Sequence, residues 1–223
     1  MKKIQFSVCV LFALSSASVL AQDNTFRAGM INLGLHSQSP DLTSNGPAFL
    51  TPQPAGVTVG NATTILFGFT RKLTDHFDLD IVMGLPPKHD VYGRGTLAAY
   101  GITAKVKQRA PTAFINYNFG DVTNKFRPFV GLGVNYTQFF DATSTPLGDI
   151  ATGGPTKIQL KESYGFAAQI GASYKFTDRW SIVGSVATAE VKSDMTATTG
   201  SIERKTTINF RPVVLTLGIG YSF

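Results

Sequence analysis

Two carboxylates separated by one residue, Asp78 and Asp80, lie in the mainly apolar stretch 77–85. Side chains two residues apart lie on the same face of a β-strand, so both carboxylates share one face. Such a pair could serve acid–base chemistry, and a wall that does no chemistry accounts for it equally well. Because an ionised carboxylate is costly to bury without a partner, this face must border water or paired cations.

The three histidines, His36, His76 and His89, have no second metal ligand at a suitable spacing. His36 precedes Ser37, which invites comparison with a hydrolase, but a catalytic triad is assembled in space and not by adjacency in sequence. No nucleophile motif accompanies the pair. We therefore expect neither a metal nor an enzymatic activity.

The composition indicates a β-sheet protein with fewer charged residues than a soluble domain carries. Hydrophobic residues make up 43% of the 223 residues and charged residues 15%, with 22 glycines and 17 phenylalanines, whereas ordinary soluble domains carry about 25% charged residues. No basic cluster is interleaved with aromatics, so we expect no nucleic-acid partner. The Gly-x-Gly pairs at 131–133 and 218–220 lie in mid-strand without a following helix, which argues against a phosphate-binding loop and its cofactor.

The first 21 residues are typical of a secretory signal peptide. Two lysines precede the apolar run 4–14, and a small-residue cleavage site ends at Ala21. A transmembrane anchor would need about 20 apolar residues. Cys9, the single cysteine, lies within the run and away from the cleavage site, which argues against a lipoprotein. Without the leader the chain keeps 18 basic and 14 acidic residues, for a net charge of +4.

The final stretch, 209–223, alternates between an apolar face and a face of small and polar residues. The spacing polar-x-Gly-x-x-aromatic-x-aromatic is met by four residues that we take as an assembly signal: Thr216, Gly218, Tyr221 and Phe223. This spacing resembles the C-terminal signal by which bacterial outer-membrane β-barrels are assembled. The same stretch would also suit the last strand of a soluble sandwich.

Seven earlier stretches also indicate strands, of which 26–36 alternates imperfectly and 180–192 has no assignable faces, and their connections are alternately long and short. We expect these strands at about 26–36, 60–72, 77–85, 103–119, 126–140, 163–176 and 180–192. The long connections, expected as loops, are 37–58, 88–101, 141–161 and 193–205. An even number of strands, long external loops and short periplasmic turns are typical of outer-membrane barrels.

The sequence thus predicts an all-β fold, in which residues 22–223 form an eight-stranded antiparallel transmembrane β-barrel with four long external loops and three short periplasmic turns. The alternative is a soluble sandwich or lipocalin-like barrel with the same period and its apolar face inward. Against it, the faces opposite the apolar ones hold Gly, Ala, Ser and Thr instead of the Lys and Glu of a solvated exterior.

Motifs from residue 26 to the end resemble, in order, those of the outer-membrane protein W family of eight-stranded barrels. The matching segments are Phe26-Arg27-Ala28-Gly29, 84–90, 109–112, 117–119, 127–137, 163–165, Gln169-x-Gly171, 178–180, Pro212 and 218–223. The sequence departs from the family pattern at two places, which concern the molecule transported and the width of any constriction. Pro86-Pro87 replaces the usual Pro-Phe, and Tyr164 stands where the family commonly has an indole.

The resemblance implies a narrow channel in the outer membrane of a Gram-negative bacterium, through which small hydrophobic molecules enter and then leave sideways through the barrel wall. Eight strands enclose a lumen that side chains can nearly fill. The candidate lining and constriction residues are Leu66, Tyr164, Arg27, Asp78, Asp80 and Lys175. The four charged residues of this set form either a cross-barrel network or a solvated rim. Pro111 and Pro212 lack a backbone donor and mark either places where the wall could open or strand ends.

A rival interpretation is a structural or receptor barrel whose external loops bind phage, bacteriocins or surfaces without transport. A lipid-modifying enzyme is a third. The expected partners are lipopolysaccharide and other outer-membrane lipid, the barrel assembly machinery and small hydrophobic solutes, with the chain itself a monomer.

Overall fold

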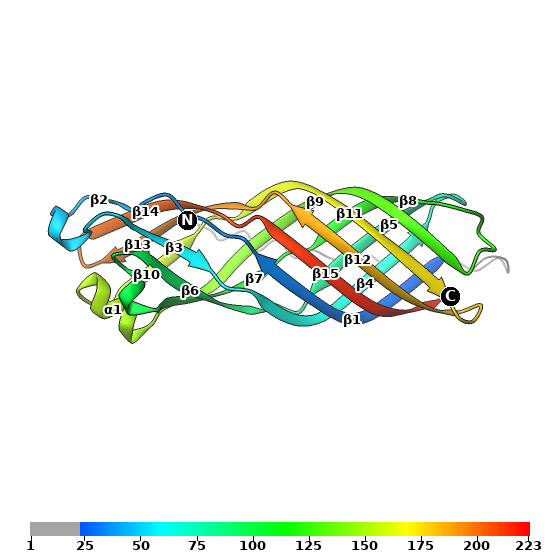
Figure 1. Cartoon of the computed structure of the whole chain (residues 1–223), viewed down its shortest axis with the longest axis horizontal. Helices are drawn as coiled ribbons and strands as arrows, with labels where there is room; N and C mark the ends of the chain where they lie inside the picture. The colour runs from blue at the N-terminus through cyan, green and yellow to red at the C-terminus, as the bar shows by residue number, and fades with distance from the viewer. Residues whose placement is uncertain (1–22) are drawn as a thin grey trace, which may run out of the picture.

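The computed structural model of the chain describes residues 23–223, so the predicted leader and its cleavage after Ala21 lie outside the described residues. Eight antiparallel strands form a closed barrel (Figure 1). They are β1 (Asn24–Leu35), β4 (Ala62–Lys72), β5 (Phe77–Gly84), β8 (Thr112–Asn118), β9 (Phe126–Ser144), β11 (Ser163–Lys175), β12 (Trp180–Ala189) and β15 (Pro212–Ser222). The predicted eight-stranded antiparallel barrel is therefore confirmed.

The ring closes because β15 pairs with β1, from Thr25 opposite Ser222 to Leu35 opposite Pro212, and β9 pairs with β11. Both ends of the barrel chain lie together, since the Phe223 amide donates to the Asn24 carbonyl at 2.9 Å. The three short turns are at this same end, as predicted for the periplasmic side. A closed ring leaves no unpaired strand edge in the wall.

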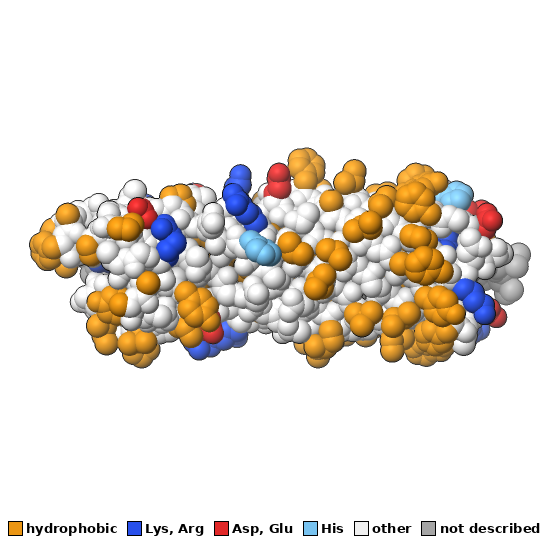
Figure 2. Space-filling model, viewed as in Figure 1, with side chains coloured by type: hydrophobic (Ala, Val, Ile, Leu, Met, Phe, Trp, Pro, Cys, Tyr) orange, Lys and Arg blue, Asp and Glu red, His pale blue; other side chains and the backbone are white. Residues whose placement is uncertain are grey.

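The outer face of the wall is apolar and the inner face is small or polar. In β15, Leu215, Leu217 and Ile219 are exposed on the outside, whereas Gly218 and Gly220 are buried. Figure 2 shows hydrophobic side chains spread over the barrel half of the molecule. Aromatic rings gather at the turn end, where Trp180 meets Tyr221 edge-on with ring centroids 5.0 Å apart. Lipid-facing bands with aromatic girdles have this arrangement.

The four predicted long loops are largely not loops, which corrects that part of the prediction. Within them the chain forms β2 (Thr43–Ser44), β3 (Ala55–Val59), β6 (Lys88–Gly95), β7 (Ile102–Arg109), β10 (Thr156–Leu160), β13 (Lys192–Thr199), β14 (Ile202–Asn209), and the helices η1 (Ala48–Leu50), η2 (Ala98–Tyr100) and α1 (Pro146–Thr152). These elements continue the barrel away from the turns (Figure 1). We call them the extension. Among residues 23–223, no helix is long and apolar enough to cross a membrane.

The polarity of the wall reverses in the extension. Its apolar side chains point inward and form one cluster that includes Val57, Val91, Met195 and Ile208. In β13, buried Met195 alternates with exposed Asp194, as in a sheet whose outer face meets water. The sequence predicts loops for these segments because their outward residues are charged or Thr, and their inward apolar residues are few.

The outward band yields a test of which face meets lipid. Leu132 in the middle of β9 is 74% exposed, and Leu132→Lys should lower the free energy of unfolding in lipid vesicles by about 2–4 kcal/mol, because it places a cation in hydrocarbon. The matched control is Leu147→Lys, at an exposed site in α1 of the extension. Denaturant titration of both variants would count against a lipid-facing band if the two losses were equal.

Candidate functional site: the barrel interior

An ion pair lies at the centre of the barrel interior. Arg27 of β1 donates through Nη2 to both carboxylate oxygens of Asp80 on β5, at 2.6 and 2.7 Å. Both side chains are almost fully buried. Thr70 of β4 donates a further hydrogen bond to Asp80 at 2.9 Å. Burial of two charges is tolerated here because the remaining carboxylate lone pairs are also engaged.

Amide side chains extend the pair across the lumen. Gln169, on β11, donates to Asp80 at 3.3 Å and to the Asn116 side-chain oxygen at 2.8 Å. Asn116 donates in turn to Asp78 at 2.8 Å, and Asn118 donates to the other oxygen of Asp78. We call these residues, with Arg27 and Thr70, the lumen network. Of the two alternatives that the sequence left open for Arg27, Asp78 and Asp80, the geometry is that of a cross-barrel network.

Gly131 makes room for this network. A Cβ atom built at Gly131 would lie 2.1 Å from the side-chain oxygen of Asn116, closer than atoms can approach. The absence of a side chain on β9 therefore lets the Asn116 amide reach Gln169 on the neighbouring β11.

Below the network, towards the turns, lies a polar lower cavity of about 140 Å³. Lys175 lines it, half-buried, and its Nζ donates to the Val122 carbonyl at 3.4 Å. Lys175 therefore faces the interior, as predicted, but has no hydrogen bond to the lumen network. Arg127 also lines the lower cavity and donates to the Asp75 carbonyl at 2.7 Å.

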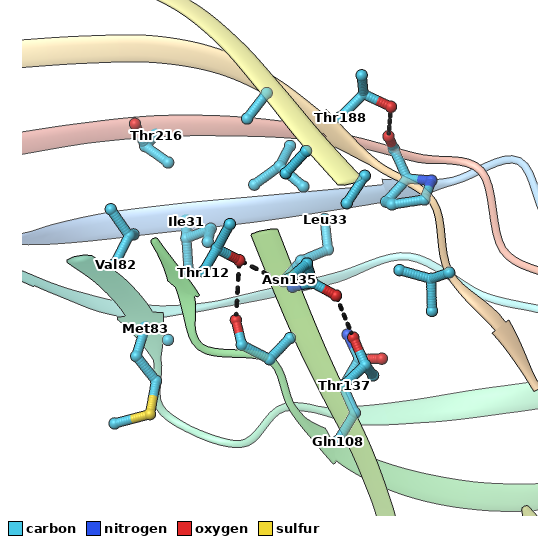
Figure 3. Close-up of a pocket in the computed structure, with 18 of the residues that line it drawn as sticks. Ile31, Leu33, Val82, Met83, Gln108, Thr112, Asn135, Thr137, Thr188 and Thr216 are labelled. Carbon is cyan, nitrogen blue, oxygen red and sulfur yellow. Dashed lines mark hydrogen bonds between the residues drawn. The ribbon is translucent and has the colours of Figure 1, made fainter. Parts of the chain in front are cut away.

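Above the network lies a mainly apolar inner cavity of about 90 Å³ (Figure 3). Ile31 and Leu33 of β1 face it, together with Val82 of β5. A short polar chain borders one side, in which Thr137 donates to Asn135 at 2.7 Å and Asn135 donates to Thr112 at 2.8 Å. The cavity therefore suits a small apolar molecule with few polar groups.

A larger outer cavity of about 270 Å³ lies within the extension. The apolar cluster of the extension joins the two cavities, since Leu42 and Met195 line the outer one and Val191 and Phe210 line the inner one. Four cluster members line neither cavity and form a septum between them: Val59, Val106, Phe139 and Ile208. Phe139 stacks on Phe210 with ring centroids 4.9 Å apart.

The wall is least paired between β5 and β8. That ladder has six residue pairs and ends at Val82 opposite Thr112, whereas the other ladders of the barrel have at least seven and as many as twelve. Beyond it the chain passes Pro86–Pro87 on one side and Pro111 on the other, and proline has no N–H to donate. We call this stretch the seam.

A groove of about 640 Å³ lies on the outer face of the wall beside the seam and is mostly lined by apolar residues. Ile81, Pro111 and Tyr136 are among its lining residues. Thr112 and Asn135 line both this wall groove and the inner cavity. Those two side chains therefore stand between the apolar interior and the face that meets lipid.

The two uncharged candidates for lumen lining have different positions. Leu66 is 1% exposed and lies inside, packed with Ile31 and Leu33. Tyr164 is 76% exposed and stacks on Tyr136 outside the wall, which corrects its assignment to the lumen. Strand alternation explains the error, because Ala167 and Gln169 of β11 point inward and Tyr164 has the opposite parity.

The four residues of the predicted assembly signal lie in the closing strand. Thr216 points inward and hydrogen-bonds Ser185 at 2.7 Å, and a Cβ at Gly218 would lie 3.0 Å from the Ala28 carbonyl oxygen. Tyr221 and Phe223 belong to the aromatic end of the barrel. Their role in assembly stays a prediction.

Sequence reasoning missed Gln169 and Phe210. Strand alternation could have indicated Gln169, since it shares a face with Gly165, Ala167 and Gly171 in β11. Phe210 lies at the start of the alternating final stretch, on the inward face with Pro212, and nothing in the sequence distinguishes it from other wall residues. Within residues 23–223 there is no group of three or more His, Cys, Asp or Glu side chains arranged to hold a metal ion.

A closed eight-stranded barrel with an apolar outer band, an aromatic girdle and a polar interior defines the chain as an outer-membrane β-barrel of a Gram-negative bacterium. More particularly, the chain belongs to the OmpW family, whose family model matches residues 22–223.

Relatives and solved structures agree with this membership. The chain is 30% identical over 225 residues to "Outer membrane protein W" of Vibrio cholerae, with all of both chains covered. It is 27% identical to "Dibenzothiophene metabolism operon protein PahQ" of Pseudomonas aeruginosa, covering 99% of this chain and 100% of that protein. The crystal structure of OprG from P. aeruginosa superposes with a TM-score of 0.81 at 27% identity and covers 90% of this chain and 95% of that one.

The buried pair can be tested by removing one partner and then both. Asp80→Leu leaves Arg27 buried without its counter-charge and should lower the free energy of unfolding in vesicles by about 3–5 kcal/mol. In the double variant Arg27→Met/Asp80→Leu the loss should be smaller than in Asp80→Leu alone, because no unpaired charge remains. The cycle is completed by Arg27→Met alone, and losses of the two single variants that simply add up to that of the double variant would show that the two side chains do not interact.

Proposed function

We propose that this barrel takes up small hydrophobic molecules and releases them sideways, through the seam, into the outer membrane. The observation that carries the proposal is the position of Thr112 and Asn135, which line both the inner cavity and the wall groove. At this point an apolar solute in the inner cavity is separated from the lipid-facing groove by the segment of wall that carries these two side chains. Thr112 belongs to the terminal register pair of both the β5–β8 and the β8–β9 ladders, and the ends of strand ladders open more readily than their centres.

The direct way to the periplasm is unfavourable for such a solute. The lumen network fills the barrel below the inner cavity with buried charges and hydrogen-bonded amides. Displacing it would break a charge-assisted pair and leave polar groups unsatisfied, while an apolar solute offers no hydrogen bond in return. Exit through the wall avoids this cost and ends in hydrocarbon.

The outer cavity supplies the entrance. It lies in the part of the molecule that stands outside the membrane, and the septum separates it from the inner cavity. Solutes would cross when the septum side chains rotate away. The septum is apolar throughout, so it excludes water and ions in either state and favours hydrophobic permeants.

The composition of the interior supports passive passage over catalysis, because no histidine is among the described residues that line the cavities and the wall groove, and a serine nucleophile needs such a base. The name of one relative refers to the metabolism of dibenzothiophene, an apolar aromatic molecule. That name belongs to the relative, and here it suggests dibenzothiophene as a probe of the expected chemical class.

The exit can be tested by filling it. Thr112→Trp should reduce the initial rate of dibenzothiophene uptake by cells at least severalfold, because the indole occupies the place between the inner cavity and the wall groove. The control is Ala172→Trp, which adds the same side chain on the lipid side of β11, away from the seam. The measurement is uptake by cells with matched amounts of folded barrel, compared with cells that lack the gene. Unchanged uptake in Thr112→Trp would rule out the seam as the exit.

The septum yields a prediction of opposite sign. Phe210→Ala should raise the rate of uptake, because it removes the ring that stacks on Phe139 and widens the connection between the cavities. It should also lower the free energy of unfolding by about 3–5 kcal/mol, as expected for a buried Phe. If the barrel loses stability without any gain in rate, the septum is not the barrier to entry.

A further inference from the structure

One buried cation in the outer cavity has no carboxylate partner. Arg204, on β14, lines this cavity and is 2% exposed. Its guanidinium donates to Thr51 Oγ1 at 2.9 Å, to Thr199 Oγ1 at 3.1 Å, and to the carbonyls of Leu50 and Thr152, both at 3.2 Å. All four acceptors are neutral, and one N–H of Nη1 is left over among the contacts of residues 23–223.

The neighbouring carboxylates are engaged elsewhere. Glu203 forms an ion pair with Lys205 at 2.7 Å, and Asp149 of α1 accepts from the Thr156 amide at 3.1 Å. Among the described residues, Arg204 takes part in no ion pair, whereas the equally buried Arg27 is paired with Asp80.

A buried charge without a counter-charge is energetically unfavourable. Burial lowers the pKa of Arg204, yet a guanidinium stays protonated in proteins, so the unfavourable burial persists. An anion that entered the cavity would relieve it. Carboxylates suit this role, since the planar fork of a guanidinium matches their geometry.

The rest of the cavity is suited to a hydrocarbon. Leu42, Val57 and Met195 line it, and Phe49 and Ile150 line it while also exposing much of their surface at the tip of the molecule. Figure 2 shows hydrophobic side chains at this tip, at the opposite end from the lipid-facing band. The volume of about 270 Å³ is close to the lower end of ligand pockets, so a medium-length chain fits better than a long one.

We propose that the outer cavity is a binding site for carboxylated amphiphiles of medium chain length, with the carboxylate on Arg204 and the hydrocarbon against Leu42, Val57 and Met195. This inference deepens the proposed uptake function, on which it rests for its biological meaning, by naming a class of molecule that the entrance would select. Binding itself is measured without transport.

A purely structural role for Arg204 is the competing explanation, because the side chain ties together residues 50–51, 152 and 199. Arg204→Gln separates the two. Its amide can still donate hydrogen bonds to neutral oxygens, but the positive charge is gone. Arg204→Lys retains the charge and loses the planar fork.

The experiment measures binding of octanoate and of 1-octanol to the whole mature chain in lipid nanodiscs, by equilibrium dialysis with empty nanodiscs as background. The wild-type protein should prefer octanoate over octanol, and Arg204→Gln should remove at least about tenfold of the octanoate affinity while leaving octanol binding unchanged, since charge-assisted hydrogen bonds are worth that factor or more. Arg204→Lys should lie between the two.

Equal affinity for octanoate and octanol in the wild type, or equal loss of both in Arg204→Gln, would overturn the proposal. Ala104→Phe serves as a second variant, because Ala104 lines the cavity from β7, a strand that carries none of the four acceptors of the guanidinium. It should abolish binding of both probes, and unchanged octanoate binding would likewise overturn the proposed site. Protease resistance of the extension confirms that each variant is folded.

The experiments can contradict the proposed uptake function and the proposed carboxylate site independently of each other. If Arg204→Gln loses octanoate binding while dibenzothiophene uptake is normal, the site is supported and neutral permeants do not require it. If octanoate binds in the expected way but Thr112→Trp does not alter uptake, the site stands and the exit through the seam is wrong.

Discussion

The structure depends on one constraint, that every backbone N–H and C=O in the hydrocarbon layer must find its partner within the chain. Closing eight strands into a ring meets it, as the continuous registers from β1 to β15 and from β9 to β11 show. Closure also decides which side chains face lipid and leaves a lumen so narrow that side chains fill most of it. The seam between β5 and β8 is therefore significant because it is the place in the wall where this constraint is met least completely.

The narrow lumen accounts for the two kinds of chemistry inside. Charges that point inward cannot be solvated individually, so Arg27 and Asp80 pair and the amides of Asn116 and Gln169 satisfy the remaining lone pairs. Above them the interior is mostly apolar and partly empty. A polar lower half and an apolar upper half suit a hydrophobic molecule above the network better than below it, which supports the sideways route proposed above.

Much of this could be predicted from the sequence, and the parts that could not have physical reasons. The period of two and the alternation of long and short connections predicted the eight strands of the barrel, and parity predicted that Arg27, Asp78 and Asp80 point inward. Strand alternation places Gln169 on the inner face, but it does not reveal which side chains meet across a lumen, so its hydrogen bonds to Asp80 and Asn116 could not be predicted. Tyr164 was misplaced because it lies on the outward face of its strand, opposite to Ala167 and Gln169. The extension was missed because its wall polarity is inverted where the chain leaves the membrane, and Thr-rich, charged outer faces read as loop.

Strand β9 runs unbroken from Phe126 to Ser144, through the membrane and into the extension. Phe139 of the septum and Asn135 beside the seam lie on it four residues apart, which is about 13 Å along a strand, and share its inward face. In the proposed route, the side chain that must rotate for entry and one that borders the exit therefore belong to the same strand. A shift of β9 along its length would therefore alter both ends of the proposed route at once.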